Sequence, residues 1–428
     1  MKKKITIAIA GLGSRGYDTY ADIVQQFSDQ LELTAIADID PERVAQAASN
    51  YHIPENRCFS SAEQLLEEER LADVLFLCTQ DRQHVPQAIP AIKKGYHLLL
   101  EKPISPNLEE CLQLLHIAQQ YQRHVVVCHV LRYTPLYGKL KELLDSGIIG
   151  EIMTVQAIEN VGYFHQAHSF VRGNWRKEEE TSPMILAKCC HDMDMLLWLT
   201  GKTCRAVSSF GALTHFRSDC APKGAAKRCM DGCKAKADCP YDAEKIYITD
   251  PELGVANGHT GWPVNVLDLH PTIESIQKAI QIGPYGRCVY YCDNDVVDHQ
   301  VVNLDMTDGT TINFTMCGFT SENCRHTKIM GTLGEITANT ETKVITVTRF
   351  GQKPEVIDIK AISTDLSGHG GGDIRMIKEF MELLLKDGKP SNRLTSLERS
   401  LESHFIALAA EESRLHGGCC IEMQNFKS

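Results

Sequence analysis

The stretch KITIAIAGLGSRG, residues 4–16, decides the fold of the first part of this chain. The segment KITIAIA is an apolar run typical of a buried strand, and three glycines follow it at the spacing G-x-G-x-x-G. In this context Gly11 permits a tight turn, Gly13 lets the backbone approach a pyrophosphate, and Gly16 allows close packing of helix on strand. We therefore expect a strand–turn–helix unit that binds a dinucleotide. The alternative is the same unit packed without a ligand.

The residues around this turn indicate which dinucleotide is bound. A helix that begins at Ser14 and Arg15 presents unpaired N–H groups and the positive end of its dipole to phosphates. A second apolar strand ends at Asp38, whose carboxylate can accept hydrogen bonds from both ribose hydroxyls and would repel a 2′-phosphate. Since neither Ile39 nor Asp40 supplies a cation, the sequence favours NAD over NADP.

The composition restricts the class of protein and its partners. Among 428 residues, 43% are hydrophobic and 23% are charged, as in ordinary soluble globular proteins. The net charge of −11 argues against nucleic acid or an anionic membrane as the main partner. No stretch approaches the roughly 18 apolar residues of a membrane span. Seventeen cysteines, including Cys78 and Cys128 at the ends of predicted buried strands, favour a cytoplasmic protein with reduced thiols.

The order of the predicted elements divides the chain into two domains. Strands and helices alternate through residues 1–128, which predicts an α/β Rossmann-type domain with a parallel sheet covered on both faces. Strand patterns with polar–apolar alternation dominate residues 129–428, and a few helices accompany them. We expect an α+β domain there, with a large, mainly antiparallel sheet for substrate binding and oligomerisation. A Cys-rich insertion is predicted at about residues 217–245.

The tripeptide Glu101-Lys102-Pro103 follows a predicted strand of the parallel sheet. Open α/β sheets bind ligands at the carboxyl ends of their strands. A lysine there can donate to a substrate oxygen and stabilise negative charge that develops during hydride transfer. Glu101 is expected to hold the ammonium group in place. The alternative is a solvated lysine at a strand end.

A second group of polar residues lies on a predicted helix, CCHDMDMLLWL at residues 189–199. Lys188, His191 and Asp194 are spaced three apart and share one face of such a helix. Histidine is suited to take a proton from an alcohol, because its usual pKa lies near neutral pH. Asp194 is expected to orient the ring or to contact the substrate. The alternative is a buried core histidine on an apolar helix.

The order and spacing of these elements resemble the glucose–fructose oxidoreductase, inositol dehydrogenase and rhizopine-catabolism (Gfo/Idh/MocA) family over nearly the whole chain. The resemblance implies tightly bound NAD(P) and hydride transfer to or from a secondary carbinol of a sugar or cyclitol. It implies catalytic roles for Lys102 and His191, and a homodimer or homotetramer formed through the large sheet. Further matching positions are Thr79 and His84 near the nicotinamide ribose, residues 129–133 at the entry to the second domain, and Trp175 and Arg176 before the catalytic helix.

One position departs from the pattern of that family. The family often has an aspartate four residues before the histidine, where this chain has Ala187, followed by Lys188. A second cation at this place suggests that Lys188 orients the substrate, which would suit an acidic sugar or a glycoside. The alternative is that Lys188 pairs with a nearby carboxylate such as Asp192, one helical turn away.

Four cysteines form a cluster in the insertion, within a stretch rich in lysine and glycine. A cross-link would give such a loop one shape, and four thiolates suit a closed tetrahedral zinc site. The spacing lacks C-x-x-C knuckles, so an iron–sulfur cluster and free or disulfide-paired cysteines remain alternatives. The candidate ligands are Cys220, Cys229, Cys233 and Cys239.

Two other segments are weaker candidates for the substrate site. Tyr163, His165, His168 and Arg172 form a polar, aromatic stretch after the first predicted strand of the second domain. His369 lies in a glycine-rich turn before a helix. Solvated loops are the alternative for both.

Together these residues predict an NAD-dependent oxidoreductase that acts on a secondary hydroxyl of a sugar, cyclitol or glycoside. His191 would take the hydroxyl proton, and Lys102 would stabilise the nascent alkoxide. The second hypothesis is a glycoside-cleaving enzyme that oxidises its substrate transiently with retained NAD. The third is a non-catalytic NAD-binding regulator, which would need neither residue.

Overall fold

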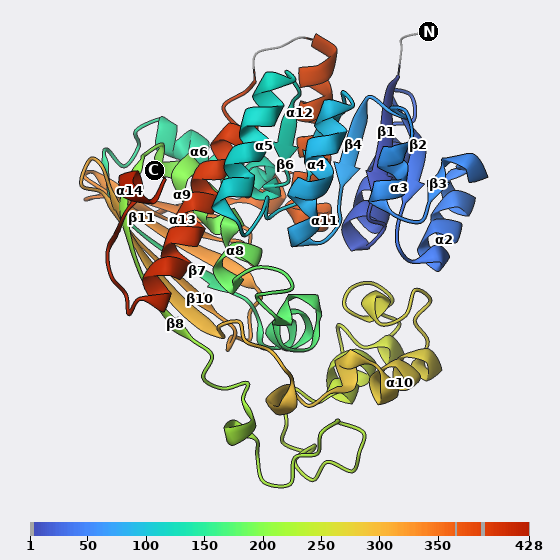
Figure 1. Cartoon of the computed structure of the whole chain (residues 1–428). Helices are drawn as coiled ribbons and strands as arrows, with labels where there is room; N and C mark the ends of the chain where they lie inside the picture. The colour runs from blue at the N-terminus through green and yellow to red at the C-terminus, as the bar shows by residue number, and fades with distance from the viewer. Residues whose placement is uncertain (1–3, 364–365, 387–389, 428) are drawn as a thin grey trace.

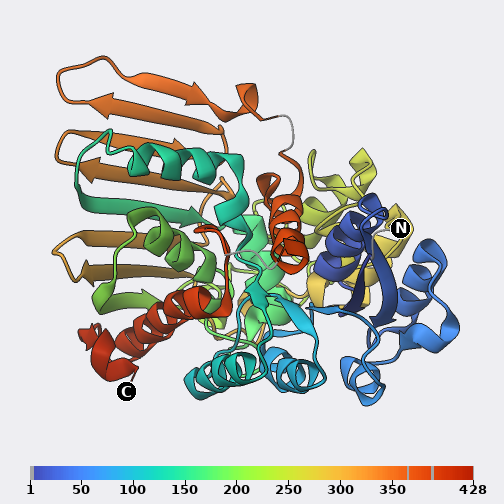
Figure 2. The same ribbon diagram turned by 90° about the horizontal axis from the view of Figure 1, so that it is seen from above.

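The computed structural model describes residues 4–363, 366–386 and 390–427. Figure 1 shows two β-sheets, each covered by helices, and Figure 2 shows them side by side. The predicted fold class, a Rossmann-type domain plus an α+β domain, is confirmed. Among the described residues, no helix has both the length and the apolar character needed to cross a bilayer.

The first sheet is entirely parallel, with the strand order β3-β2-β1-β4-β5-β6. This order places the reversal of strand sequence between β1 and β4, which is where doubly wound sheets bind dinucleotides. Strands β4 and β5 are continuous apolar runs, as burial on both faces requires. The strands are β1 (Ile5–Ala10), β2 (Leu31–Ala37), β3 (Cys58–Phe59), β4 (Val74–Leu77), β5 (His97–Leu100) and β6 (Val125–Val127).

Helices cover both faces of this sheet. Pro41 at the first turn and Asp40, which accepts from the backbone N–H of Glu42, begin helix α2. Asn107 caps α5 in the same way, through the N–H groups of Glu109 and Glu110. The helices are η1 (Ser14–Ala21), α1 (Asp22–Gln26), α2 (Pro41–Tyr51), α3 (Ala62–Glu67), α4 (His84–Lys93) and α5 (Leu108–Gln120).

The second sheet has nine strands in the order β14-β13-β12-β11-β7-β10-β9-β8-β15. Among these described strands, β10 and β7 pair in parallel and the other pairs are antiparallel. The strands are β7 (Ile152–Asn160), β8 (Cys204–Ala212), β9 (His299–Met306), β10 (Thr311–Cys317), β11 (Cys324–Gly331), β12 (Gly334–Asn339), β13 (Val344–Arg349), β14 (Glu355–Asp358) and β15 (Ile421–Glu422).

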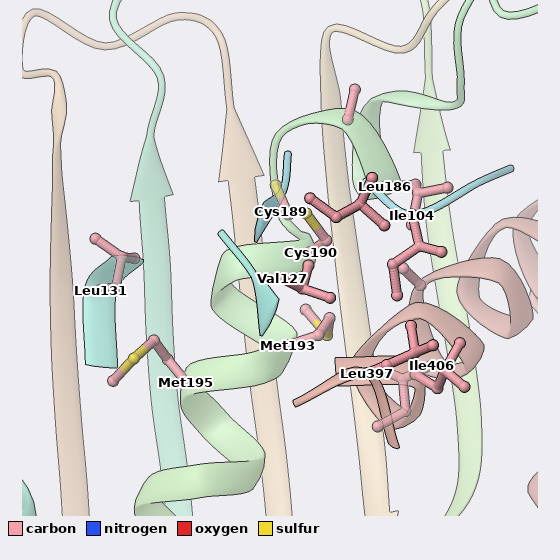
Figure 3. Packing of buried hydrophobic residues seen from close by; sticks show 14 of the residues in the cluster. Ile104, Val127, Leu131, Leu186, Cys189, Cys190, Met193, Met195, Leu397 and Ile406 are labelled. Carbon is pink, nitrogen blue, oxygen red and sulfur yellow. The ribbon is translucent and has the colours of Figure 1, made fainter. Parts of the chain in front are cut away.

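One face of this sheet is covered by helices and packs into the main core, while side chains such as Met153 and Phe210 are exposed. The covering helices are α6 (Pro135–Asp145), α8 (Met184–Ala187), α9 (Cys190–Thr200) and α13 (Leu397–Leu415). In the close view of Figure 3, Cys189, Cys190 and Met193 lie among apolar side chains that include Ile104 and Ile406. The junction of α8 and α9 is thus held against the nucleotide domain by a shared core.

Two arrangements differ from the sequence-based expectation. The insertion extends from the end of β8 to the start of β9, well beyond residues 217–245, and includes α10 (Ile273–Ile282). Figure 1 shows it below the nucleotide domain. Helix α12 (Gly372–Lys386), from the far end of the chain, packs Met376 and Phe380 into the core of the nucleotide domain. Apolar periodicity predicts a helix at this place but does not say which core it joins.

Candidate active site

The glycine turn has the geometry that a dinucleotide requires. Gly11 has φ +92°, and a Cβ there would lie 2.4 Å from the carbonyl oxygen of Cys78. A Cβ on Gly16 would lie 1.8 Å from the carbonyl oxygen of Gly11, so only glycine allows η1 to approach the strand this closely. At Gly13 the nearest atom to such a Cβ is a guanidinium nitrogen of Arg43, 3.4 Å away. The space at Gly13 therefore fits a pyrophosphate.

Asp38 lies at the end of β2, beside this turn. Its Oδ2 accepts from the backbone N–H of Leu12 at 2.5 Å, and its Oδ1 accepts from that of Asp40 at 2.9 Å. These bonds fix the carboxylate beside the turn. Sequence reasoning missed Arg43, which lies beside Gly13 and pairs with Asp40 at 3.5 Å. That pairing offsets the positive charge that Arg43 brings to this end of the turn.

Arg15 is held by carboxylates. Its Nε lies 2.7 Å from Glu101 Oε1, and its Nη2 lies 2.6 Å from Asp373 Oδ1. Burial alone would raise the pKa of Glu101, but the Arg15 guanidinium and the Tyr20 hydroxyl outweigh burial and lower it. The expectation that Glu101 holds the ammonium of Lys102 therefore needs correction, because its carboxylate bonds to Arg15 and Tyr20. Arg15 joins the glycine turn to β5 and α12.

Lys102 and His191 come together at the junction of the two domains. Lys102 Nζ donates to the carbonyl oxygen of Ala187 at 2.9 Å, just before α9 begins. The His191 side chain is buried, and its Nδ1 has no hydrogen-bond partner among the described residues. Burial lowers the pKa of His191 well below its usual value, and the nearby Lys102 ammonium and His129 lower it further. The imidazole is therefore neutral, and one of its ring nitrogens carries a lone pair.

A second histidine, His129, lies against His191. Its ring is 0% exposed, and neither of its nitrogens has a partner in the described part of the chain. The ring centroid of His129 lies 5.5 Å from those of both His191 and His404. Burial and the neighbouring Arg132 hold the pKa of His129 well below its usual value. The sequence places His129 directly after strand β6, and this position indicates a residue near the ligand, because the carboxyl ends of parallel strands face the ligand.

Lys188 lies in a buried charge network. Its Nζ lies 3.1 Å from Glu159 Oε1, and Arg325 bridges Glu159 at 3.0 Å and Asp192 at 2.7 Å. Burial raises the pKa of Glu159, although Arg325 and Lys188 oppose this. The alternative for Lys188, pairing with a nearby carboxylate, is what the structure shows, but the partner is Glu159 on β7 and not Asp192, which pairs with Arg325.

Asp194 does not have the geometry of a substrate ligand. Its two carboxylate oxygens accept from Arg132 Nε at 2.7 Å and Nη2 at 2.6 Å, and both side chains are buried. The expectation that Asp194 contacts the substrate therefore needs correction, because its carboxylate is occupied by Arg132. The ion pair attaches helix α9 to η4 (Val130–Tyr133), the segment that leaves the nucleotide domain.

Trp175 and Arg176 brace the same region. The indole N–H of Trp175 donates to Asp81 Oδ1 at 3.2 Å, and Asp81 lies just after β4. Arg176 pairs with Asp293 at 3.0 Å and with Glu180 at 3.1 Å. Trp175 thus connects its segment to the loop after β4, where Asp81 lies. The guanidinium of Arg176 is directed toward Asp293 and Glu180.

Thr79 and His84 shape the loops at the ends of β4 and β5. His84 is buried, with Nε2 3.0 Å from the carbonyl oxygen of Thr79 and Nδ1 2.7 Å from that of Pro103. Thr79 Oγ1 donates to Gln87 at 2.6 Å. His84 therefore joins the loop of Thr79 to the loop of Lys102.

The polar stretch after β7 divides into two parts. Burial lowers the pKa of His165 well below its usual value, and Lys188 and His168 lower it further. The ring centroid of His165 lies 4.8 Å from that of Trp262. His168 turns to the insertion, where Nδ1 lies 3.0 Å from the Tyr247 hydroxyl. Tyr163 packs on Phe164 and Tyr241. Trp262 of the insertion is an aromatic neighbour of the site that sequence reasoning missed, because nothing in its local sequence indicates where the insertion folds.

His369 lies beside the nucleotide turn. Its Nδ1 is 3.0 Å from Asp373 Oδ2 and 3.2 Å from Arg15 Nη1. It is also near enough to His191 to contribute to lowering the pKa of that residue. The glycine-rich segment therefore reaches the same region as the other candidate residues.

The four predicted metal ligands separate into two groups. Cys220 is exposed, and its sulfur lies 3.3 Å from the carbonyl oxygen of Thr214. Cys229, Cys233 and Cys239 line one cavity. Within the described ranges, the trio whose ligand atoms all lie within 4.8 Å of one another is Glu322, Cys324 and His326.

Comparison with known proteins identifies the class. A family model described as "Oxidoreductase family, NAD-binding Rossmann fold" matches residues 5–129, and the companion model, "Oxidoreductase family, C-terminal alpha/beta domain", matches residues 141–417. The chain is therefore an oxidoreductase with an NAD-binding Rossmann domain. It belongs to the Gfo/Idh/MocA family, as its motifs indicate.

Individual relatives are distant. The chain is 22% identical to "Putative oxidoreductase YteT" of Bacillus subtilis, over 87% of this chain and 88% of that one. It is 27% identical to an inositol 2-dehydrogenase of Corynebacterium glutamicum, over 47% and 56%. An alpha-N-acetylgalactosaminidase of Bacteroides fragilis is 25% identical over 39% of each chain. The WlbA dehydrogenase of Bordetella pertussis, solved with NADH and UDP-GlcNAcA, shares the fold with TM-score 0.69 and 18% identity over 99% and 98%.

Proposed function

We propose that this protein transfers a hydride between NAD and a secondary hydroxyl of a sugar, cyclitol or glycoside. The observation that supports this most is the convergence of Lys102 and His191, which come from different domains, beside a glycine turn that fits a pyrophosphate. A binding protein without turnover needs neither an ammonium nor a neutral imidazole at this place. NAD, when bound, supplies the hydride acceptor.

His191 acts as the base in the direction of oxidation. Its neutral ring has a nitrogen without a partner among the described residues, so it can accept the proton of the substrate hydroxyl. Lys102 stabilises the alkoxide that forms when this proton leaves, since an ammonium interacts more strongly with the charged oxygen than with the hydroxyl. The bond from Lys102 to Ala187 holds the ammonium next to the helix that bears the base.

Lys188 is proposed to orient the substrate. It pairs with Glu159, but Arg325 and Asp192 belong to the same network, so the charge of Glu159 is shared between two cations. An anionic or strongly polar substituent on the substrate would find a partner in Lys188. The nearby rings of His165 and Trp262 would contact the apolar face of a sugar ring.

Three further proposals complete this function. Asp38 next to the turn, with Arg43 paired to Asp40, favours NAD over NADP. The exposed side chains on the uncovered face of the nine-stranded sheet favour a homodimer or homotetramer formed through that face. All seventeen cysteines, each within the described ranges, are unpaired, which suits a reducing compartment such as the cytoplasm.

Glycoside cleavage through transient oxidation is the second candidate function. The similarity to an alpha-N-acetylgalactosaminidase over 39% of this chain favours it. A substrate that is oxidised and then reduced again within one cycle would leave no NADH to accumulate. The same base and ammonium would serve it.

A panel assay distinguishes these functions. The purified protein would be incubated with NAD and a set of polyols, sugars, acidic sugars and glycosides, with NADH and released sugar measured in parallel. NADH formation supports the proposed dehydrogenase, and sugar release without NADH supports the second function. Bound NAD without either product across the panel would contradict both and favour a regulator.

A further inference from the structure

The insertion contains a cavity that the proposed reaction does not use. It has a volume of about 20 Å³ and lies among the short turns between β8 and β9. Four cysteines line it: Cys229, Cys233, Cys239 and Cys288. Three of them are close together in the sequence, whereas Cys288 follows helix α10 and approaches from the other side of the insertion.

Hydrogen-bond donors surround one of these sulfurs. Cys229 Sγ accepts from the backbone N–H of Ala243 at 3.4 Å and from Arg172 Nη2 at 3.6 Å. This sulfur therefore accepts two hydrogen bonds, one of them from a guanidinium. Hydrogen bonds to cysteine sulfurs are a regular feature of thiolate metal centres.

Arg172 is itself unusual. Its side chain is 1% exposed, and the bonds that the structure records go to the carbonyl oxygens of Arg287 and Tyr241 and to Cys229. Its Nη1 has no partner among the described residues. A buried guanidinium whose recorded partners include no carboxylate needs negative charge nearby, and thiolates in the adjoining cavity would supply it.

Asp242 provides a second, independent sign of a ligand. It lines the same cavity, is 2% exposed, and neither of its carboxylate oxygens has a hydrogen-bond partner within the described ranges. A buried carboxylate without donors favours a positively charged occupant. A cavity lined by a carboxylate and four sulfurs therefore fits a metal, and Arg172 and Lys236, which also line it, would offset part of the negative charge of the ligands.

We propose that Cys229, Cys233, Cys239 and Cys288 bind a thiolate-ligated metal centre, either an iron–sulfur cluster or a zinc ion, and that Cys220 is not a ligand. Cys220 is exposed and does not line the cavity. The centre would fix the outer part of the insertion, whose inner part carries Trp262 next to His165. This inference does not depend on the proposed reaction.

The spacing of the sulfurs favours the cluster. All four cysteines are among the described residues, and no three of their sulfurs lie within 4.8 Å of one another. A single zinc ion binds sulfur at about 2.3 Å and draws its four ligands into one tetrahedron. In a [4Fe–4S] cluster each thiolate binds a different iron, so the four sulfurs lie farther apart than around zinc, and the cavity of about 20 Å³ would have to open to admit the cluster.

The test is metal analysis of the full-length protein purified without oxygen. Elemental analysis, acid-labile sulfide and the visible absorption spectrum would be measured before and after reconstitution, once with iron and sulfide and once with zinc alone. We expect either about four irons with matching sulfide or about one zinc per chain. A chain that holds neither after both reconstitutions would overturn the proposal.

Two variants test the choice of ligands. Cys288→Ala should lose at least half of the bound metal, whereas the matched control Cys220→Ala should keep all of it. Loss in Cys220→Ala with full retention in Cys288→Ala would overturn the assignment. X-ray absorption of the unmodified protein checks the result independently of variant folding, because it should show sulfur ligation, and a centre bound only by nitrogen and oxygen would contradict the proposal.

Discussion

The carboxylate of Asp194 receives two hydrogen bonds from Arg132, at 2.7 and 2.6 Å, and thereby attaches the helix that bears His191 to the segment leaving the nucleotide domain. Both side chains are buried, so removal of one partner leaves an uncompensated charge. Asp194→Asn should therefore destabilise the protein by about 3–5 kcal/mol. Urea unfolding measures this free energy.

An exposed ion pair is the matched control for that variant. Lys139 and Glu142 lie one turn apart on α6, at 2.7 Å. Glu142→Gln should change the free energy of unfolding by no more than about 1 kcal/mol. Equal effects of the two substitutions would show that the buried pair does not hold the helix.

Gly13→Ala should separate folding from cofactor binding. The added Cβ meets nothing closer than Arg43 at 3.4 Å, so the protein should fold with a nearly unchanged Tm. The methyl group would occupy the space for the pyrophosphate and weaken NAD binding at least about tenfold, as titration calorimetry would show. Gly16→Ala should behave differently, because its Cβ lies 1.8 Å from a carbonyl oxygen and folding itself should suffer. Unchanged NAD affinity in Gly13→Ala would place the cofactor elsewhere.

Asp38→Asn should change the choice of cofactor. The substitution removes the charge that repels a 2′-phosphate and weakens the bonds to the ribose, so NAD affinity should fall roughly tenfold or more while the NADP-to-NAD preference rises. Asp29→Asn, at an exposed position before β2, is the control and should leave both affinities unchanged. Fluorescence titration with each dinucleotide provides the measurement. An unaltered NADP-to-NAD preference would show that Asp38 does not bind the ribose.

Acid should destabilise the histidine core near the site. Burial and neighbouring His129 lower the pKa of His404 to about 3, and its neutral ring accepts from the N–H of Ile104 at 2.8 Å. The unfolded chain, with a histidine pKa of about 6.5, binds the proton more readily. The stability from this residue is therefore complete above about pH 6.5 and falls by about 1.4 kcal/mol per pH unit between about 6.5 and 3.

His404→Gln should reduce that pH dependence. Urea unfolding at pH 7 and pH 5.5 would be compared for the variant and the unmodified protein, with His416→Gln as the control because His416 lies on the surface. The slope of stability against pH should be smaller in His404→Gln alone. The same slope in all three proteins would show that His404 is not held neutral.

The sequence predicts the nucleotide domain well because its signals are local. An apolar strand, the glycine spacing and a terminal Asp38 each depend on a few adjacent residues, and the structure confirms that fold. The expectation for Lys102 is also local, since it rests on the position of one strand end.

The remaining features depend on contacts between distant residues. Glu101 bonds to Arg15 instead of Lys102, Lys188 pairs with Glu159 on another element, and Asp194 pairs with Arg132. The spacing of residues along one helix or strand does not indicate which distant residue each of them contacts. The insertion shows the same difficulty, because the cavity that contains Cys229 also contains Cys288 and excludes Cys220, although Cys220 is nearer in the sequence.

The most direct test of the central claim is the steady-state rate of Lys102→Met and His191→Asn with the substrate that the panel identifies. Each variant should lose roughly 100- to 10,000-fold in kcat/KM, because each removes a group that we propose to act on the reacting oxygen. NAD affinity should stay within about twofold of the unmodified protein, since neither residue forms the glycine turn. Full turnover in either variant would contradict the account.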